Sequence, residues 1–486
     1  MDLLWKAIIV VVFSVGMKFL IKSYQTPELP PNFGGHVEPG FEAVEQAFRE
    51  NFEDGFEPDG AAFAVCHRGK LVVDLWGGYA DKMAVRPWKK DTLTTTFSNT
   101  KIISALVIAK LVDRGLLSYD DPVIKYWPEF GKHGKDVVTV KMLVSHQAAV
   151  AALDEPITLD VVRDWRKMSK LFEDQVPNWP IGTTVGYHVF TFGWLCEQLV
   201  RRVDPKQRSI GQFFHEEIAK PFGLDYFIGI PREELYRVAR LTPRSLWDVI
   251  IRLGDWFFAK IVLLFLLTPS KPFTAKANFN PDWLDMTGGR FKFNNPDIHQ
   301  LEAPGANGIG NARSLAQLMC LLDGTKLLSE HTIKKISQPS SINRKDEVIG
   351  MNYSTGWGFF FTENPKGHYV MGHPGFGGQN SKYDPQEHLA FSYVRNHMAP
   401  DMGESSMTLR NLQDALYDSI DALKNTEVLR DWRDNDLCCK GVGIEVKVAG
   451  EEETSWWILT RCCPMVVYGS VANMAGVIPT NIDLLL

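Results

Sequence analysis

The chain has 486 residues, of which 45% are apolar and 23% are charged, and its formal net charge is −6. This is an ordinary globular composition, and the length suffices for two or three domains or for one large domain with insertions. The sequence contains no basic stripe and no interleaving of aromatic and basic residues, so we exclude a nucleic-acid partner.

The first segment of the chain is apolar on every face. Residues 3–21 read LLWKAIIVVVFSVGMKFLI, which is about the length that crosses a bilayer as a helix. Lys6 and Lys18 lie near its ends, where their amines can reach the interface. No small-residue cleavage site follows, so we favour an uncleaved transmembrane signal anchor over residues 1–23, rather than a cleaved signal peptide or a buried helix. The flanking lysines are balanced, so the sequence leaves the orientation of this single-pass protein open. The secretory pathway and mitochondria both remain as compartments.

A linker rich in Pro and Gly covers residues 24–36. Apolar residues at helical spacing predict a helix within 37–53. Two apolar runs around HRGK predict a β-hairpin from about residue 61 to residue 76. A strongly apolar helix follows from Ser98 to Arg114, and Gly115 ends it.

The middle of the chain is mostly helical, as in PITLDVVRDWRKMSKLFE and YHVFTFGWLCEQLVRRV. A capped helix is predicted over Ser314–Leu322. Three later runs, YSTGWGFFFT, HYVMGHPGFGGQNSKYD and HLAFSYVRN, predict three antiparallel strands, and MTLRNLQDALYDSIDALK predicts a closing amphipathic helix. The predicted fold over residues 37–425 is therefore α+β, with an antiparallel sheet flanked by helices and an inserted helical subdomain.

Two segments lie outside this plan. Residues 246–268 form an apolar insertion, and the four charges within it argue against a membrane span. An amphipathic helix on a membrane or a flap over an acyl pocket fits better, and a buried helix remains an alternative. Residues 426–486 form a C-terminal tail for which the sequence predicts no structure.

The seven cysteines fall into two groups. Cys66, Cys196 and Cys320 lie in apolar segments, and we interpret them as small buried residues. The tail holds two adjacent pairs, Cys438 with Cys439 and Cys462 with Cys463. Zinc ligand pairs usually keep two or more residues between the thiols, so disulfides or plain thiols are favoured over a metal site. We predict no metal and no cofactor.

The stretch TTTFSNTKIISALVIAK places Ser98 and Lys101 three residues apart at the head of the apolar helix. Residues i and i+3 share a helix face, and a helix N-terminus favours developing negative charge. A buried lysine loses proton affinity, and a neutral amine beside a hydroxyl is a general base that activates a nucleophile. Taken alone, the pair also fits a capping serine followed by a solvated lysine.

Other motifs accompany this stretch in a fixed order: LVDRGLLSYDDPVIKYWPEF, TVKMLVSHQAAV, PIGTTVGYHVFTFGWLCEQLVRRV, GANGIGNARSLAQLM and GHPGFGGQN. The ordered set resembles the penicillin-binding protein and beta-lactamase superfamily, whose Ser-x-x-Lys carries the nucleophile. It is most similar to the class C branch, with its serine carboxylesterases and the beta-lactamase-domain proteins of animals. The resemblance covers residues 37–425 and implies a beta-lactamase/transpeptidase-like fold.

The resemblance implies a role for each matching position. Ser98 is the nucleophile, and Lys101 accepts its proton. Tyr187 takes the place of the second-motif tyrosine, which shares the proton work and protonates the leaving group. A phenol that does this needs a neighbouring cation to lower its pKa, and Lys101 is the expected cation.

The third motif supplies the other side of the predicted site. His373 and Gly375 fall where the family has Lys-Thr-Gly, on the strand that borders the site. His373 is expected to hydrogen-bond substrate or to tune Tyr187. The backbone amides of Ser98 and Phe376 are the expected oxyanion hole.

Two departures from the family pattern bear on the substrate. Tyr-x-Asn is here Tyr187-His188-Val189, and the Lys-Thr-Gly cation is missing. Both changes weaken the case for antibiotic hydrolysis, and both are shared with esterase-like members. SHQAAV also replaces the usual SHTSGL.

These motifs predict a membrane-anchored serine hydrolase that cleaves a small ester or amide through an acyl-enzyme, with a peptide or a lipid also left open as substrate. One alternative is a scaffold or binding protein that keeps the fold without turnover, and another is a serine peptidase. The oligomeric state is left open.

Overall fold

The computed structural model describes residues 29–30, 32–243, 272–284, 291–399 and 406–434, and three short strands within 444–468. The predicted membrane anchor, the apolar insertion 246–268 and the four tail cysteines lie outside the described residues. Within the described part, no helix is long and apolar enough to cross a membrane. The chain divides into two compact units, Met1–Ala415 and Leu416–Leu486.

A ten-stranded sheet forms the centre of the first unit, and every neighbouring pair in it is antiparallel. Its order is β1-β3-β2-β13-β12-β11-β10-β9-β8, with β4 paired to β3. The strands are β1 (Phe33–Val37), β2 (Gly60–His67), β3 (Lys70–Asp81), β4 (Arg86–Pro87), β8 (Ser341–Lys345), β9 (Asn352–Gly356), β10 (Phe359–Glu363), β11 (Tyr369–Gly375), β12 (Gln379–Asp384) and β13 (Leu389–Arg395).

The two ends of the first unit meet at the middle of this sheet. β2 pairs with β13 in a register that sets Ala61 opposite Arg395 and Phe63 opposite Tyr393. Both strands are almost wholly buried, which explains their near-continuous apolar sequences. The predicted α+β fold, with an antiparallel sheet built from both chain ends, is confirmed.

The local strand predictions had mixed outcomes. The hairpin around HRGK is confirmed, because β2 and β3 join through Arg68 and Gly69, both with positive φ. The prediction of three later strands is wrong, since the first two runs are each a hairpin. A turn at Trp357 and Gly358 joins β9 to β10, and a turn at Gly377 and Gly378 joins β11 to β12. Positive φ at these positions makes the tight turns.

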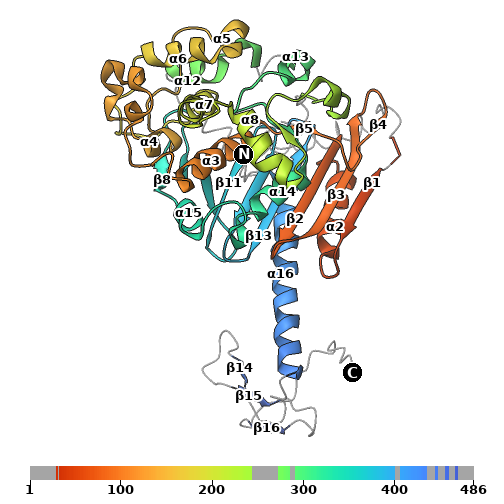
Figure 1. Cartoon of the computed structure of the whole chain (residues 1–486). Helices are drawn as coiled ribbons and strands as arrows, with labels where there is room; N and C mark the ends of the chain where they lie inside the picture. The colour runs from red at the N-terminus through yellow and green to blue at the C-terminus, as the bar shows by residue number, and fades with distance from the viewer. Residues whose placement is uncertain are drawn as a thin grey trace, which may run out of the picture. The chain divides into compact units, whose positions relative to one another are not determined.

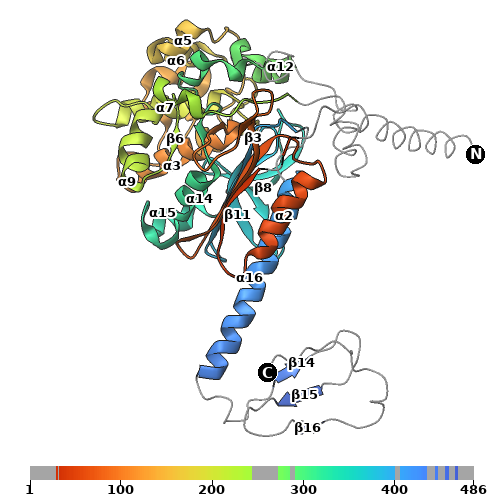
Figure 2. The same ribbon diagram turned by 90° about the vertical axis from the view of Figure 1, so that its right-hand side faces the viewer.

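Helices cover both faces of the sheet, with α2 on one side and α14 and α15 on the other (Figures 1 and 2). Most of the other helices that lie between β5 and β8 in the sequence, among them α5, α6 and α7, form a layer over one end of the sheet. The α-helices are α2 (Glu42–Glu53), α3 (Thr100–Asp113), α4 (Val140–Val144), α5 (Leu159–Arg163), α6 (Trp165–Asp174), α7 (Thr191–Val203), α8 (Ile210–Phe214), α9 (Lys220–Phe222), α12 (Pro272–Phe279), α13 (Pro296–His299), α14 (Ala312–Cys320), α15 (Glu330–Ile336) and α16 (Met407–Asp434).

Shorter turns complete the first unit. The 3-10 segments are η1 (Phe97–Asn99), η2 (Val123–Lys125), η3 (Pro128–Val137), η5 (Arg232–Arg237), η6 (Asp282–Leu284), η7 (Lys292–Asn294) and η8 (Asp323–Thr325), and η4 (His215–Ala219) is a π-helix. A second small sheet joins β5 (Thr94–Thr95), β7 (Ile309–Gly310) and β6 (Tyr226–Phe227) just before the Ser98 turn.

The helix boundaries follow local capping chemistry. Asn311 caps α14, because its side chain accepts from the Ser314 amide, and this confirms the helix predicted after GANGIGNAR. The closing helix α16 is longer than predicted and crosses from the first compact unit into the second. The second unit also contains the antiparallel strands β14 (Ile444–Val446), β15 (Ser455–Ile458) and β16 (Val466–Tyr468).

A disulfide joins Cys66 on β2 to Cys320 at the end of α14, with a Cα–Cα distance of 6.0 Å. The prediction that both cysteines are buried is confirmed, but the bond between them was not predicted. α14 packs on β2 and brings the two sulfur atoms together. Cys196 on α7 is buried, as predicted, and its thiol is free.

Candidate active site

Ser98 lies in the 3-10 turn η1, directly before α3 begins at Thr100. From Thr92 to Ala109 it is the one residue that is not buried. The helix behind it is buried on nearly every face, which accounts for the apolar run that follows Lys101 in the sequence. The fold therefore presents a single hydroxyl, at a helix N-terminus, from an otherwise enclosed segment.

The backbone before Ser98 is held in an unfavourable conformation. Phe97 has a φ of 48°, in the left-handed region that a bulky side chain rarely adopts. Its ring packs edge-on against Phe293 and Phe376, with ring centroids 4.9 and 5.6 Å away. Such strain costs about 1 to 3 kcal/mol and persists only where surrounding contacts fix it. The packing of Phe97 thus sets the direction of the Ser98 side chain.

Lys101 is fully buried and has three polar neighbours. Its Nζ donates to the carbonyl oxygens of Val189 and Gly305, each at 2.7 Å, and lies 3.2 Å from Ser98 Oγ. Burial lowers the pKa of Lys101 well below its usual value. A neutral amine has two N–H groups and one lone pair. The two carbonyls take both N–H groups, so the lone pair is left for the Ser98 hydroxyl.

Tyr187 approaches Ser98 from the other side. Its hydroxyl donates to Ser98 Oγ at 2.8 Å. The Lys101 Nζ lies 4.8 Å from the centre of the Tyr187 ring. The structure therefore brings Ser98, Lys101 and Tyr187 together, as the family resemblance implies.

The predicted lowering of the Tyr187 pKa is wrong. Burial raises the pKa of Tyr187 above its usual value, and the hydrogen bond to Ser98 offsets this only in part. The physical reason is that burial disfavours the charged form of both groups, since it raises the Tyr187 pKa and lowers the Lys101 pKa. Tyr187 is thus a neutral phenol and a proton donor towards Ser98.

His373 lies on β11 and is buried. Its Nδ1 donates to the carbonyl of Pro374 at 2.7 Å, and its Nε2 has no hydrogen-bond partner among the described residues. Its ring lies 5.8 Å from the Tyr187 ring and 4.7 Å from that of Phe360. Burial lowers the pKa of His373 well below its usual value. The structure therefore places His373 beside Tyr187 through ring packing, without a hydrogen bond between them.

Gly375 and Phe376 border the Ser98 turn. A Cβ on Gly375 would lie 2.7 Å from the Thr96 carbonyl oxygen, so only glycine lets β11 come this close. Gln379 on β12 donates from its Nε2 to the Thr95 carbonyl at 2.9 Å and fixes the turn to the sheet.

The sequence profile of the family described as Beta-lactamase matches residues 48–415. This chain belongs to the beta-lactamase family. It is 29% identical over 391 residues to the protein named Esterase/beta-lactamase LipL of Mycobacterium tuberculosis, and the match covers 78% of this chain and 86% of that protein.

Two solved structures support the same family. A penicillin-binding protein homolog from Caulobacter crescentus is 34% identical, with a TM-score of 0.68, and the match covers 80% of this chain and all of that one. A family VIII carboxylesterase is 32% identical, also with a TM-score of 0.68, over 80% of this chain and 99% of that one. The resemblance predicted from the motifs, to beta-lactamase-related serine hydrolases, is confirmed.

Sequence reasoning missed one side chain of this beta-lactamase-family site. His146 follows α4, and its carbonyl accepts from the Gly186 amide at 3.0 Å while its Nδ1 accepts from the His188 amide at 3.2 Å. The two bonds hold the backbone on both sides of Tyr187. The His146 ring also packs against the Tyr187 ring, with centroids 5.0 Å apart. The motif SHQAAV carried the signal, but only as a family match without a role.

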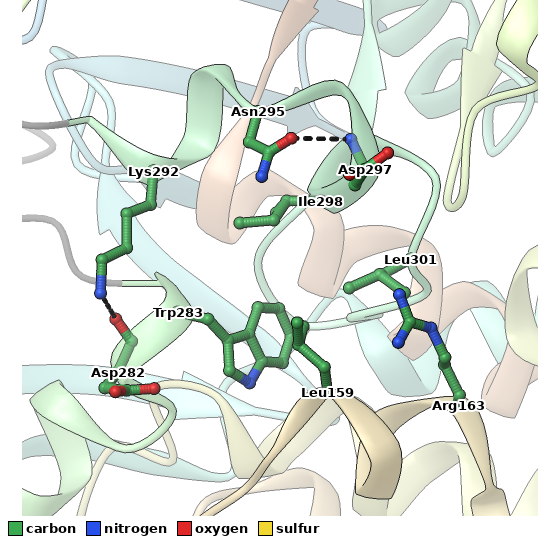
Figure 3. Close-up of a pocket in the computed structure, with 9 residues that line it drawn as sticks. All are labelled: Leu159, Arg163, Asp282, Trp283, Lys292, Asn295, Asp297, Ile298 and Leu301. Carbon is green, nitrogen blue, oxygen red and sulfur yellow. Dashed lines mark hydrogen bonds between the residues drawn. The ribbon is translucent and has the colours of Figure 1, made fainter.

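A cavity of about 370 Å³ lies among the helices, and Figure 3 shows its lining. Trp283, Ile298 and Leu301 form an apolar floor, and none of the predicted site residues lines it. Two rim groups already have partners, since Lys292 Nζ donates to the Asp282 carbonyl at 2.6 Å and Asn295 caps α13. The hollow is therefore separate from the Ser98 site of this family member. In the parts of the chain that the structure describes, no group of three His, Cys, Asp or Glu side chains is arranged to hold a metal ion.

Proposed function

We propose that this chain is a carboxylesterase-like serine hydrolase that cleaves an uncharged carboxylic ester through an acyl-enzyme on Ser98. The observation that carries the proposal is that the partly exposed Ser98 hydroxyl contacts both a buried proton acceptor, Lys101, and a buried proton donor, Tyr187. Lys101 offers a lone pair at 3.2 Å, and Tyr187 offers an O–H at 2.8 Å. This is the arrangement that nucleophilic catalysis by a serine requires.

In acylation, the Ser98 hydroxyl proton passes to the Lys101 Nζ while Oγ forms a bond to the ester carbonyl carbon. The N–H groups of Ser98 and Phe376 stabilise the resulting oxyanion, and donors of this kind contribute about 3 to 4 kcal/mol. Collapse of the intermediate breaks the bond to the alcohol oxygen, which takes the Tyr187 proton. The Lys101 ammonium then returns a proton to the Tyr187 phenolate.

In deacylation, water attacks the acyl carbon and passes a proton to Lys101. The bond between the carbon and Ser98 Oγ breaks, and Oγ regains a proton from Lys101. The free acid leaves, and the three side chains return to their starting protonation states. The two side chains that transfer protons, Lys101 and Tyr187, lie within hydrogen-bond reach of Ser98 Oγ, as general acid–base catalysis requires.

The charge of the site favours an ester without a nearby carboxylate. His373 stands where the Lys-Thr-Gly family members have a lysine, and its lowered pKa keeps it neutral. Val189 provides a backbone carbonyl to Lys101, and its side chain has no amide for a substrate. Relatives named as an esterase and as a family VIII carboxylesterase support this substrate class.

We also propose that residues 1–23 anchor the protein in a membrane and that the folded domain lies on an oxidising side of it. The Cys66–Cys320 disulfide supports this placement, because disulfides persist in secretory and extracellular compartments and are rare in the cytosol. Of the two compartments consistent with the sequence, the secretory pathway therefore has the stronger physical support.

The test is labelling of the purified protein with a fluorophosphonate probe, together with turnover of p-nitrophenyl esters. We expect labelling and turnover in the wild type and in a Ser118→Ala control, and neither in Ser98→Ala. Equal signals in the wild type and Ser98→Ala would refute the hydrolase proposal and favour the scaffold alternative. A panel of esters and peptides compared side by side separates an esterase from a peptidase.

A further inference from the structure

A short hairpin at one edge of the sheet exposes apolar side chains to solvent. β3 and β4 pair at the β1 edge (Figure 1). The loop between them, residues 82–85, contains Met83 and Val85. Met83 is 88% exposed and Val85 is 56% exposed. Val85 also has a φ of 52°, which a β-branched residue adopts only at a cost. A strained and exposed valine contributes nothing to packing, so the loop sequence is not explained by folding.

Cations surround these apolar side chains. Residues 81–91 contain Lys82, Arg86, Lys89 and Lys90 against only two carboxylates, although the whole chain has a net charge of −6. The three lysines are exposed. Arg86 donates to the carbonyls of Tyr236 and Val238, which ties η5 to the hairpin. The Tyr236 side chain is itself 74% exposed. Apolar and aromatic tips among basic residues are typical of surfaces that bind the membrane interface.

The chain enters the fold at this same hairpin. The Tyr79 hydroxyl donates to the Pro30 carbonyl at 2.7 Å, and Asn32 donates to the carbonyls of Gly78 and Trp88. Only residues 24–29 separate Pro30 from the predicted anchor. An extended chain of that length reaches about 25 Å at most. A bilayer that holds residues 1–23 therefore lies within reach of the hairpin loop.

The second apolar run of the sequence joins the fold nearby. The Arg240 amide donates to the Ala80 carbonyl at 2.8 Å, at the base of the hairpin, and the described chain ends at residue 243, shortly before Trp247. The chain thus leads into the second apolar run from the corner at which it leaves the first, and it resumes after that run at α12, where Lys276 pairs with Asp154.

We propose that the β3–β4 hairpin, residues 82–90, is a membrane-contacting surface that rests on an anionic phospholipid bilayer. Met83 and Val85 insert among the headgroups, and the lysines lie against lipid phosphates and carboxylates. Each basic side chain near an anionic surface adds to the attraction. The proposal rests on the membrane anchor proposed above and adds a second contact, which fixes the orientation of the Ser98 site relative to the membrane.

The test uses the full chain reconstituted in vesicles, with an environment-sensitive fluorescent amino acid at Met83. The matched control carries the same probe at Ile342, which is 58% exposed on β8 at the opposite edge of the sheet. With phosphatidylserine in the vesicles, we expect a blue shift and quenching by brominated lipid at position 83 only. In a Lys82→Glu/Lys89→Glu/Lys90→Glu variant we expect the quenching at position 83 to be about tenfold weaker than with the native lysines. Ester hydrolysis by this variant in detergent should be unchanged.

The outcomes separate the hairpin from the anchor. If the protein stays on vesicles in high salt while the probes at 83 and 342 respond equally, the anchor stands and the hairpin proposal is wrong. Quenching at 83 that is equal with and without phosphatidylserine also overturns the proposal, because it removes the need for anionic lipid. If the full chain remains in solution, both membrane proposals are wrong, whereas the Ser98 hydrolase is unaffected.

Discussion

The Nζ of Lys101 lies 2.7 Å from the carbonyl oxygen of Gly305, a residue 204 positions further along the chain. The Gly305 loop packs against α7 so closely that a Cβ on Gly193 would lie 2.1 Å from the Gly305 nitrogen. The base is therefore oriented by a loop and a helix from outside its own element. This contact holds the amine in one direction and leaves its lone pair for Ser98.

The first prediction concerns the pH dependence of kcat/KM. Neutral Lys101 is the active form, so activity should rise as pH rises through the lowered Lys101 pKa. The Tyr187 pKa is raised, so its proton remains in place and activity should not fall until above pH 10. Ester hydrolysis measured across the pH range checks both limbs. A profile whose rising limb lies near the usual lysine pKa would contradict the neutral amine.

Substitution of Lys101 itself should remove the base while keeping the nucleophile. We expect Lys101→Met to lose about 10² to 10⁴-fold in kcat, the range for removal of a general base. Lys110→Met, on the same helix, is the matched control and should retain activity. Intact-protein mass spectrometry with a slow ester distinguishes failed acylation from failed deacylation.

Tyr187→Phe should lose the proton donor without disturbing the fold. We expect kcat to fall by about 10²-fold or more for esters with poor leaving groups, and by much less for p-nitrophenyl esters, whose alcohol leaves without a proton. Tyr353→Phe is the control, because Tyr353 contacts Phe360 at the same site but not Ser98. An equal loss for both leaving groups would mean that Tyr187 acts through packing alone.

Gly375→Ala tests how closely β11 must approach the nucleophile turn. The added methyl group would lie 2.7 Å from the Thr96 carbonyl oxygen, so either the strand or the turn must move. A displacement of about 1 Å at a catalytic group can cost about 10²-fold in rate. Gly131→Ala, whose added methyl would lie 3.1 Å from the Ile124 side chain and at ordinary contact distance from Asp136, away from Ser98, should leave kcat unchanged.

His146 is predicted to act as a positioning residue for Tyr187. In His146→Asn the side-chain oxygen can still accept from the His188 amide, and asparagine tolerates the φ of 61° at this position. His146→Leu leaves that buried amide unpaired, at a cost of about 1 to 3 kcal/mol. We expect the leucine variant to lose kcat with little change in KM, and the asparagine variant to retain most of the activity. If both variants fold and neither loses kcat, the positioning role is excluded.

Glu302 should make the unfolding free energy depend on pH. Burial and the neighbouring Glu197 raise the pKa of Glu302 to about 7, above its ordinary value of 4.5. The folded state therefore binds the proton more tightly, and its stabilisation is complete below pH 4.5 and lost as pH rises through 7. Glu302→Gln should flatten this slope, which is worth up to about 3 kcal/mol. Denaturant unfolding at several pH values measures the slope, and a Glu45→Gln control on α2 should keep that of the wild type.

The sequence predicted those parts of the site that local geometry determines. The spacing of Ser98 and Lys101 indicated that they share one helix face, and the ordered family motifs then favoured a catalytic pair over a capping serine and a solvated lysine. Tyr187 was assigned through the family resemblance, and a lone tyrosine in that segment would have been interpreted as a packed aromatic. The carbonyls of Val189 and Gly305 could not be predicted, because backbone acceptors have no residue signature.

The predictions that were wrong or incomplete also concern features that local sequence does not determine. The turn between β9 and β10 uses Trp357 at positive φ, which no turn propensity predicts. The Cys66–Cys320 disulfide depends on α14 packing across β2, a contact between residues 254 positions apart. The direction of the Tyr187 pKa shift was mispredicted because it depends mainly on the burial of the phenol, which the sequence does not show.

The pairing of β2 with β13 also determines when this protein can fold. β2 leaves the ribosome early and can pair with β3 at once, but its second partner ends at Arg395, so at the usual rates of synthesis one edge of the apolar strand remains unpaired for about 20 to 60 s. An unpaired apolar edge of this kind promotes aggregation. Fragments that end before β13 should therefore be insoluble, and slower synthesis with chaperone support should improve the yield of the full chain.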